Sequence, residues 1–193
     1  MRANFLDNFS FEDVMDAVGK DTDIAKKNDK IISDNNEKIE FKIEKDFGYL
    51  SDNKYAPVFT IVSWKEHKCY DLRHWLDDDK SKPGKGITLS VGEVRDLKNC
   101  LVDIDFDCCN NILRIYKNGK AKAVFYKRLS VLHEYLNKNR DAWRKEVNLI
   151  DWGTGIRLDI RKWNDEYTRC SKGITLKENE IIKLREILEG MII

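Results

Sequence analysis

The chain carries one sequence frame twice, and this repeat limits its possible folds more than any other feature. The first copy spans residues 64–89 and the second spans residues 152–176. Each copy holds two tryptophans 11 residues apart, an Asp-x-Arg just before the second tryptophan, and then a Lys-Gly-Ile-Thr-Leu segment. A frame that recurs at a fixed offset indicates a duplicated structural unit. The sequence therefore predicts two similar modules in one chain.

The 193 residues divide around this repeat. We expect an N-terminal extension with a short helix and a flexible linker at 1–38, a first module at 39–103, a linker with the start of a hairpin at 104–121, and a second module at 122–193. Modules of about 65–70 residues lie near the lower limit for a self-sufficient core, so they gain by packing on each other. The net charge is only +1, but the second module is the basic one, with 15 Lys and Arg against 11 Asp and Glu.

Hydrophobic periodicity predicts several strands and one helix in each module. Alternation begins at Ile39, and apolar runs predict further strands at 58–64, 69–75, 86–89, 112–116, 120–126, 143–152, 157–163 and 173–176. Ser90 and Glu93 form a capping box that starts one helix, and Gly190 ends the other. The expected fold class is α+β, with two tandem modules, each a curved four-stranded antiparallel sheet followed by a C-terminal helix, paired as an intramolecular pseudo-dimer.

One face of the third strand of each module combines an acid, an arginine and a tryptophan. Successive side chains of a strand alternate between its two faces, so these residues share one face. Bases stack on flat side chains for ~1–3 kcal/mol each, and cations follow the phosphates of a single strand. The candidate nucleic-acid-binding residues are Trp64, Lys65, Arg73, Trp75, Lys85, Arg144, Lys145, Trp152, Arg161, Trp163 and Lys172.

The same residues have structural alternatives. The acid and the arginine of each strand can form an ion pair that only holds the strand. One tryptophan of each pair can belong to the core, because large aromatic side chains are usually buried. The near-zero net charge also leaves a second function open, namely a protein-interaction or structural module that kept the fold and lost nucleic-acid binding. A steep loss of affinity with salt would favour the nucleic-acid function, because phosphate contacts release counterions.

The sequence shows little that resembles enzyme chemistry. The three histidines have no partner at motif spacing, and the segment at 84–86 is too short for a phosphate-binding loop. Five cysteines without metal-like spacing indicate free thiols in a reducing compartment, although Cys108 and Cys109 leave a thiol-dependent regulator as a remote alternative. No apolar run reaches the roughly 18 residues of a membrane span. We therefore expect no catalytic site, no metal, no cofactor and no membrane partner.

The order of these motifs resembles a known family. An Asp-x-Arg before an aromatic residue, a charged loop, Lys-Gly-Ile-Thr-Leu and a helix are similar to the signature of the transcriptional coactivator positive cofactor four family, closest to its short bacterial members and here in two tandem copies. The resemblance covers residues 39–103 and 124–190. It implies a four-stranded antiparallel sheet with a C-terminal helix, pairing through the helices, and binding of single-stranded or unwound DNA with little sequence preference.

The resemblance also implies roles for individual residues and a set of partners. The family's stacking aromatic, binding arginine and lysine fall on Trp64, Arg73 and Lys85 in the first copy and on Trp152, Arg161 and Lys172 in the second. Basic positions after the aromatic fall on Lys65 and His67 in the first copy but on glycines in the second, so we expect unequal binding. The expected partners are single-stranded DNA, with RNA or melted duplex as alternatives, the transcription machinery, and either the other module or a second chain. A role in transcription, replication or repair places the protein in the cytoplasm, on the nucleoid if it is bacterial.

Overall fold

The structure is a computed structural model that describes residues 41–64, 67–102, 104, 113–117, 120–137 and 139–193. The helix and linker expected at 1–38 lie outside the described residues, and so do Cys108 and Cys109. Neither helix in the described ranges is long and apolar enough to cross a membrane.

The first sheet has the four strands and the helix that the sequence predicts. It contains β1 (Phe41–Tyr49), β2 (Val58–Trp64), β3 (His67–Trp75) and β4 (Pro83–Leu89), and α2 (Val91–Cys100) follows. The strands pair with their sequence neighbours, and every pair is antiparallel. This half therefore matches the expected α+β architecture.

The second sheet has five strands, so the expectation of four is wrong for this half. It contains β5 (Leu113–Lys117), β6 (Lys120–Leu136), β7 (Ala142–Asp151), β8 (Ile156–Asn164) and β9 (Cys170–Leu176), followed by α3 (Glu178–Glu189). The hairpin predicted around the Asn-Gly dipeptide is confirmed, because β5 pairs with β6 and Lys117 lies opposite Lys120. The hairpin adds the fifth strand because β6 continues far beyond it and also pairs with β7.

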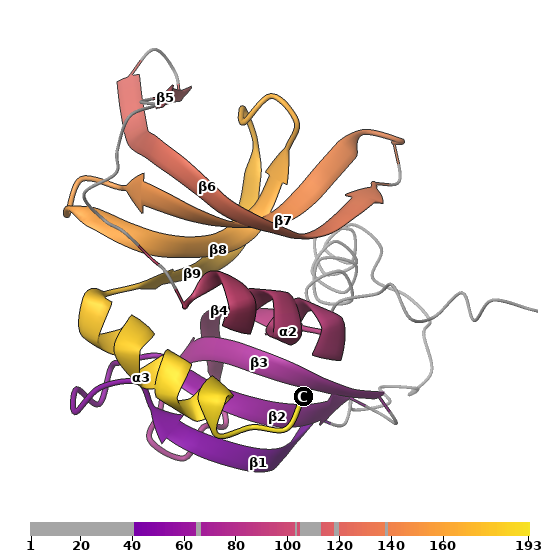
Figure 1. Cartoon of the computed structure of the whole chain (residues 1–193), viewed down its shortest axis with the longest axis vertical. Helices are drawn as coiled ribbons and strands as arrows, with labels where there is room; N and C mark the ends of the chain where they lie inside the picture. Colours follow the sequence, from indigo (N-terminus) through magenta and orange to yellow (C-terminus); the bar gives the residue numbers. More distant parts are fainter. Residues whose placement is uncertain (1–40, 65–66, 103, 105–112, 118–119, 138) are drawn as a thin grey trace, which may run out of the picture.

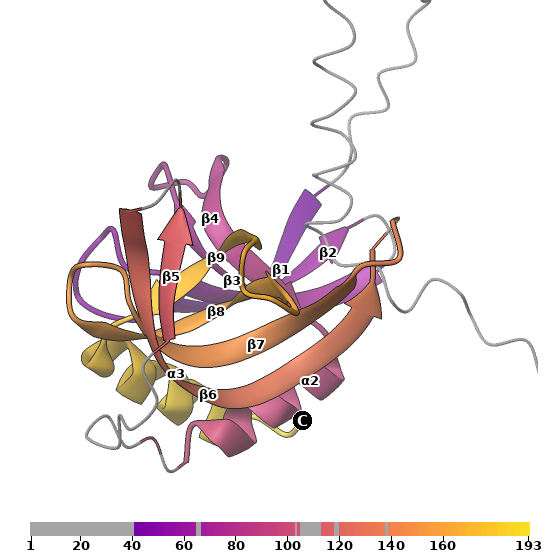
Figure 2. The same ribbon diagram turned by 90° about the horizontal axis from the view of Figure 1, so that it is seen from above.

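The length of β6 explains why the second sheet curls. The sequence predicts a strand that ends at Tyr126, but β6 runs to Leu136 and its pairing with β7 contains three register shifts. Such irregularities insert unpaired residues, bend the strand and increase its twist. The five-stranded sheet consequently forms a half-barrel that curls away from the helices (Figures 1 and 2).

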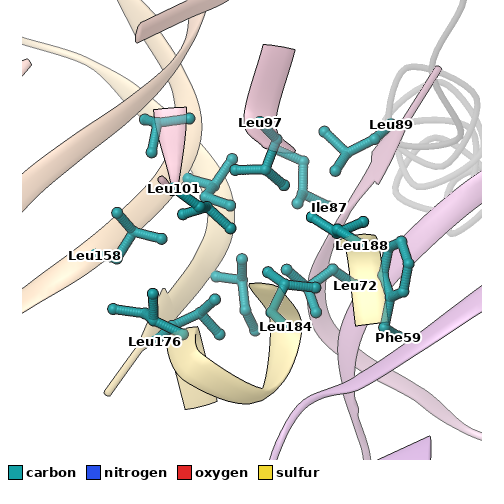
Figure 3. Close-up of a cluster of buried hydrophobic side chains, with 14 of the residues drawn as sticks. Phe59, Leu72, Ile87, Leu89, Leu97, Leu101, Leu158, Leu176, Leu184 and Leu188 are labelled. Atoms are coloured by element: carbon teal, nitrogen blue, oxygen red, sulfur yellow. The ribbon is translucent and has the colours of Figure 1, made fainter. Parts of the chain in front are cut away.

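The larger apolar core cluster joins the two halves. The helices lie between the two sheets, and α2 contacts β6 of the opposite sheet while β4 lies against β9 (Figure 1). Leu97 of α2 and Leu101, the C-cap of this helix, share the core with Leu184 and Leu188 of α3, and all four are essentially inaccessible to solvent (Figure 3). Since each buried leucine contributes about 1.5–3 kcal/mol, the two halves stabilise each other.

The two helices begin differently, and the capping box predicted for the first one is present. Ser90 accepts a hydrogen bond from the backbone N–H of Glu93, and the Glu93 carboxylate accepts one from the N–H of Ser90, which completes the capping box. At the start of α3, Glu180 accepts from the N–H of Lys177, but a lysine side chain has no oxygen with which to return the bond. Gly190 is the C-cap of α3, as expected.

Candidate nucleic-acid interface

The acid and arginine of β3 form a buried pair. The pair is bidentate, since Arg73 Nε and Nη2 donate to the two carboxylate oxygens of Asp71. The guanidinium also donates to the carbonyl of Gly84 at 3.4 Å and lies 5.9 Å from the ring centre of Trp75. Only 4% of Arg73 and 6% of Trp75 are exposed. In the free protein, the arginine of the first sheet is therefore largely covered.

The equivalent residues of β8 repeat this pair, and Trp152 from the preceding loop lies against it. Arg161 Nε and Nη2 donate to the Asp159 carboxylate at 2.6 Å and 2.5 Å. The guanidinium carbon lies 4.3 Å from the ring centre of Trp152, and the Trp152 indole N–H donates to Asp159 at 3.1 Å. Trp152 is half-buried and stacks on Trp163, with 6.0 Å between the ring centres. Acid, arginine and two indoles thus form one cluster in the second sheet.

Burial and ion pairing act against each other in these acids. Burial raises the pKa of the Asp71 and Asp159 carboxyls, while the paired guanidinium groups oppose the rise. Burial disfavours the charged form of Arg161 as well, but the charge and hydrogen bonds of Asp159 outweigh it and raise the pKa of Arg161. The arginine therefore stays charged, but its charge is balanced by the acid. Its guanidinium offers a flat surface more than a net positive charge.

A glycine in the neighbouring strand makes room for each arginine. Arg73 lies opposite Gly86, and Arg161 lies opposite Gly173 in the same register. A Cβ atom at either glycine would come closer than 3.0 Å to the Cβ of the facing arginine. The glycine of each Lys-Gly-Ile-Thr-Leu segment is therefore required by the close approach of the facing strand at the arginine.

Trp152 sits on a preorganised loop between β7 and β8. The Asp151 carboxylate accepts hydrogen bonds from the backbone N–H groups of Gly153, Thr154 and Gly155 at 2.6, 2.9 and 3.0 Å. Both glycines have positive φ angles, which glycine adopts without steric cost. The glycines that remove basic residues from this position in the second copy therefore build the loop that holds the indole.

The second tryptophan of each frame is buried in the free protein. Only 1% of Trp163 is exposed, and it packs in a small apolar cluster with Ile115, Phe125 and Ile150 on the concave face of the second sheet. Trp75 is also buried. These positions match the core alternative that the sequence leaves open, and neither indole presents an open face to a ligand.

The lysines of the repeat remain in solvent. Lys85 on β4 and Lys172 on β9 are both exposed, at the same position before the glycine. Trp64 is the last residue of β2, but its side chain lies outside the described residues, as does all of Lys65. The structure thus brings Trp152 and Arg161 together and places Lys172 next to the glycine that faces Arg161. The matching set of the first copy is described only in part.

Arg144 and Lys145 lie on opposite faces of β7. Arg144 shares the face of Arg161 and donates to Glu146 at 2.8 Å and to Asp165. Lys145 points to the helices instead, is 3% exposed, and binds the Glu93 carboxylate at 2.8 Å. Period two along the strand predicts this separation. Lys145 therefore links the two halves of the fold and does not reach the concave face.

Sequence reasoning missed a polar network on the same concave face. The fully buried Glu146 carboxylate accepts hydrogen bonds from Tyr167, Arg144, Arg128 and Asn148. Burial raises the pKa of the Tyr167 phenol, and the nearby Glu146 charge raises it further. Glu146 directly after Arg144 and Lys145 was a visible sign of an ion pair on β7. Its partners Arg128 and Tyr167 come from β6 and from the turn after β8, which the sequence does not reveal. These hydrogen bonds tie β7 to β6 and to the turn after β8, on the face that carries Arg161.

Comparison with known proteins identifies the first half. Residues 51–100 match the model of the family described as Transcriptional Coactivator p15 (PC4). The chain is also 35% identical over 57 residues to an uncharacterized protein of Treponema pallidum (strain Nichols), in an alignment that covers 29% of this chain and 67% of the relative. No solved structure matches. The resemblance is therefore confirmed for the first copy, and the second copy at 122–193 stays a prediction.

Proposed function

Since the chain belongs, through residues 51–100, to the transcriptional coactivator p15 (PC4) family, whose members bind single-stranded DNA, we propose that it binds single-stranded DNA with little sequence preference. Proteins of this family are generally non-enzymatic binding proteins, and the proposal includes no reaction. Transcription, replication and repair all expose single strands, and each remains a candidate process.

The observation that carries this proposal is the cluster around Trp152. The guanidinium carbon of Arg161 lies 4.3 Å from the ring centre of this half-buried indole. The loop that carries the indole is held by three hydrogen bonds from backbone N–H groups to the Asp151 carboxylate. A fixed aromatic ring suits base stacking, which contributes ~1–3 kcal/mol per base and tolerates every base. Because Asp159 balances the charge of Arg161, exposed lysines such as Lys172 attract the phosphates.

We also propose that the two halves arose as two copies and pair as an intramolecular pseudo-dimer. Equivalent pairs support this proposal, since Arg73 faces Gly86 as Arg161 faces Gly173, with a register shift after the arginine in both sheets. The shared core between the sheets supports the pairing. In this arrangement one chain contains both sheets and both helices, which a dimer would take from two separate chains.

The test is fluorescence anisotropy of a labelled oligo-dT of about 20 nucleotides at low and moderate salt. Trp152→Leu should weaken binding by about 5- to 150-fold, which corresponds to the loss of one stacked base at ~1–3 kcal/mol. Lys172→Ala should weaken binding and reduce the salt dependence, because one phosphate contact is lost. Removing an arginine is less informative, since it would leave a buried carboxylate unpaired.

Lys85→Ala is the matched control for Lys172→Ala. Both lysines are exposed and precede the glycine of their strand, so neither substitution disturbs the core. A larger effect at Lys172 would assign the main site to the second sheet, while equal effects would assign binding to both. If the parent protein shows no salt-dependent binding, the proposal is refuted, and a protein-interaction module becomes the better account.

A further inference from the structure

The β5–β6 hairpin brings an additional cation to Trp152. Lys122 lies on β6, is exposed, and places its Nζ atom 5.5 Å from the ring centre of Trp152. The Arg161 guanidinium approaches the same ring at 4.3 Å. Two cations therefore converge on one half-buried indole. The four-stranded sheet has no counterpart of this hairpin among the described residues.

The acids near this cluster are already engaged. Asp159 binds Arg161 and the indole N–H, and the Asp151 carboxylate accepts three backbone N–H groups of its own loop. Within the part of the chain that the structure describes, no carboxylate pairs with Lys122. Its positive charge is consequently uncompensated beside the ring on which a base would stack.

The position of Lys122 fits a contact to phosphate. A cation–π contact at an exposed site is worth about 0.5–1 kcal/mol, which is less than the ~1–3 kcal/mol of a stacked base. A base can therefore replace the ammonium group over the indole. The four-carbon stem of lysine is flexible, so the displaced ammonium can reach the backbone of the same nucleotide.

We propose that Lys122 binds the phosphate of the nucleotide whose base stacks on Trp152, which makes the β5–β6 hairpin part of the binding site. This inference rests on the proposed function, because it names a further residue and a further element of the same site. It gives the fifth strand a purpose beyond covering the sheet edge. It also makes the two sheets unequal, since among the described residues the hairpin belongs to the second sheet alone.

The experiment measures oligo-dT binding by anisotropy at several salt concentrations for the parent, Lys122→Ala and Lys127→Ala. Lys127 is the matched control, because it is an exposed lysine on the same strand and its substitution removes the same charge. Lys122→Ala should weaken binding about 5- to 10-fold at low salt. It should also reduce the slope of log affinity against log salt by about 0.7, the value for one phosphate contact with a single strand. Lys127→Ala should change affinity less than about twofold.

The outcomes separate this inference from the proposed function. If the parent binds and Trp152→Leu weakens binding, but Lys122→Ala behaves as Lys127→Ala, the function stands and the role of Lys122 is wrong. Tighter binding by Lys122→Ala would also overturn the inference, because it would mean that the ammonium only blocks the ring. Absence of binding by the parent would overturn both.

Discussion

The contact between Lys145 and Glu93 predicts a large stability effect far from the concave face. The Lys145 Nζ atom lies 2.8 Å from a Glu93 carboxylate oxygen and 2.9 Å from the Thr88 carbonyl oxygen. Only 3% of Lys145 and 7% of Glu93 are exposed. Lys145→Met keeps the apolar stem but leaves a buried carboxylate without its cation. We expect this substitution to destabilise the protein.

The magnitude follows from the partners that remain. Removing one member of a buried ion pair typically costs about 3–5 kcal/mol. Glu93 retains its capping hydrogen bond from the N–H of Ser90 at 2.7 Å, so we expect the lower end, about 3 kcal/mol. With a urea m-value of about 1–3 kcal/mol/M, the unfolding midpoint should fall by roughly 1–3 M.

Urea unfolding followed by circular dichroism is the assay, and Lys183→Met is its control. Lys183 pairs with Glu186 at 3.1 Å on the surface of α3, with both side chains about half exposed. Such exposed pairs contribute about 0.2–1 kcal/mol, so the control should stay close to the parent. If Lys145→Met shifts the midpoint no more than Lys183→Met, the idea that this pair holds the halves together is refuted.

Three further predictions concern single residues. Gly173→Ala should destabilise the protein by about 1–3 kcal/mol, because the new Cβ meets Arg161. Its control is Gly92→Ala in α2, where the new Cβ meets only Ser90 Oγ at 4.0 Å, and which should raise the melting temperature slightly. Equal shifts of the melting temperature in the two variants would contradict this prediction. Burial raises the pKa of Cys69 to about 11 and of Cys100 to about 12, so alkylation at pH 8 should be slow in the folded protein and fast in urea. Since these thiols bind protons more tightly when folded, stability should also fall as pH rises above 9, and a flat profile from pH 9 to 10.5 would count against it. Asp151→Ala should speed amide hydrogen exchange at residues 153–155 about tenfold or more, because their shared acceptor is lost; unchanged exchange would show that the loop holds itself.

Local patterns predict the elements of this fold well because their causes are local. The capping box of Ser90 and Glu93 and the stop at Gly190 depend on residues within one turn. The strand at 69–75 follows from alternation and is observed as His67–Trp75. Such features can be read from the sequence because no distant contact is needed to form them.

The rest depends on contacts between distant segments. The register shifts that bend β6 interrupt its alternation, so the strand beyond Tyr126 gives no clear signal. Trp163 is buried because the β5–β6 hairpin supplies Ile115 and Phe125, which lie 48 and 38 residues earlier in the chain. Strand alternation alone puts Lys145 and Arg144 on opposite faces of β7. The partner of Lys145, Glu93, lies 52 residues earlier in the chain and is visible only in the structure.

The shared core affects how substitutions can accumulate in the two halves during evolution. In a symmetric dimer of identical chains, every substitution appears twice, so a change that helps one subunit is also imposed on the other. Here the two sheets belong to one polypeptide, and each position occurs once. Among the described residues, the Lys145–Glu93 contact joins β7 to α2 without a second copy of the pair, and the extra hairpin belongs to the second sheet alone. Joining the halves therefore frees one sheet to specialise while the other continues to support it.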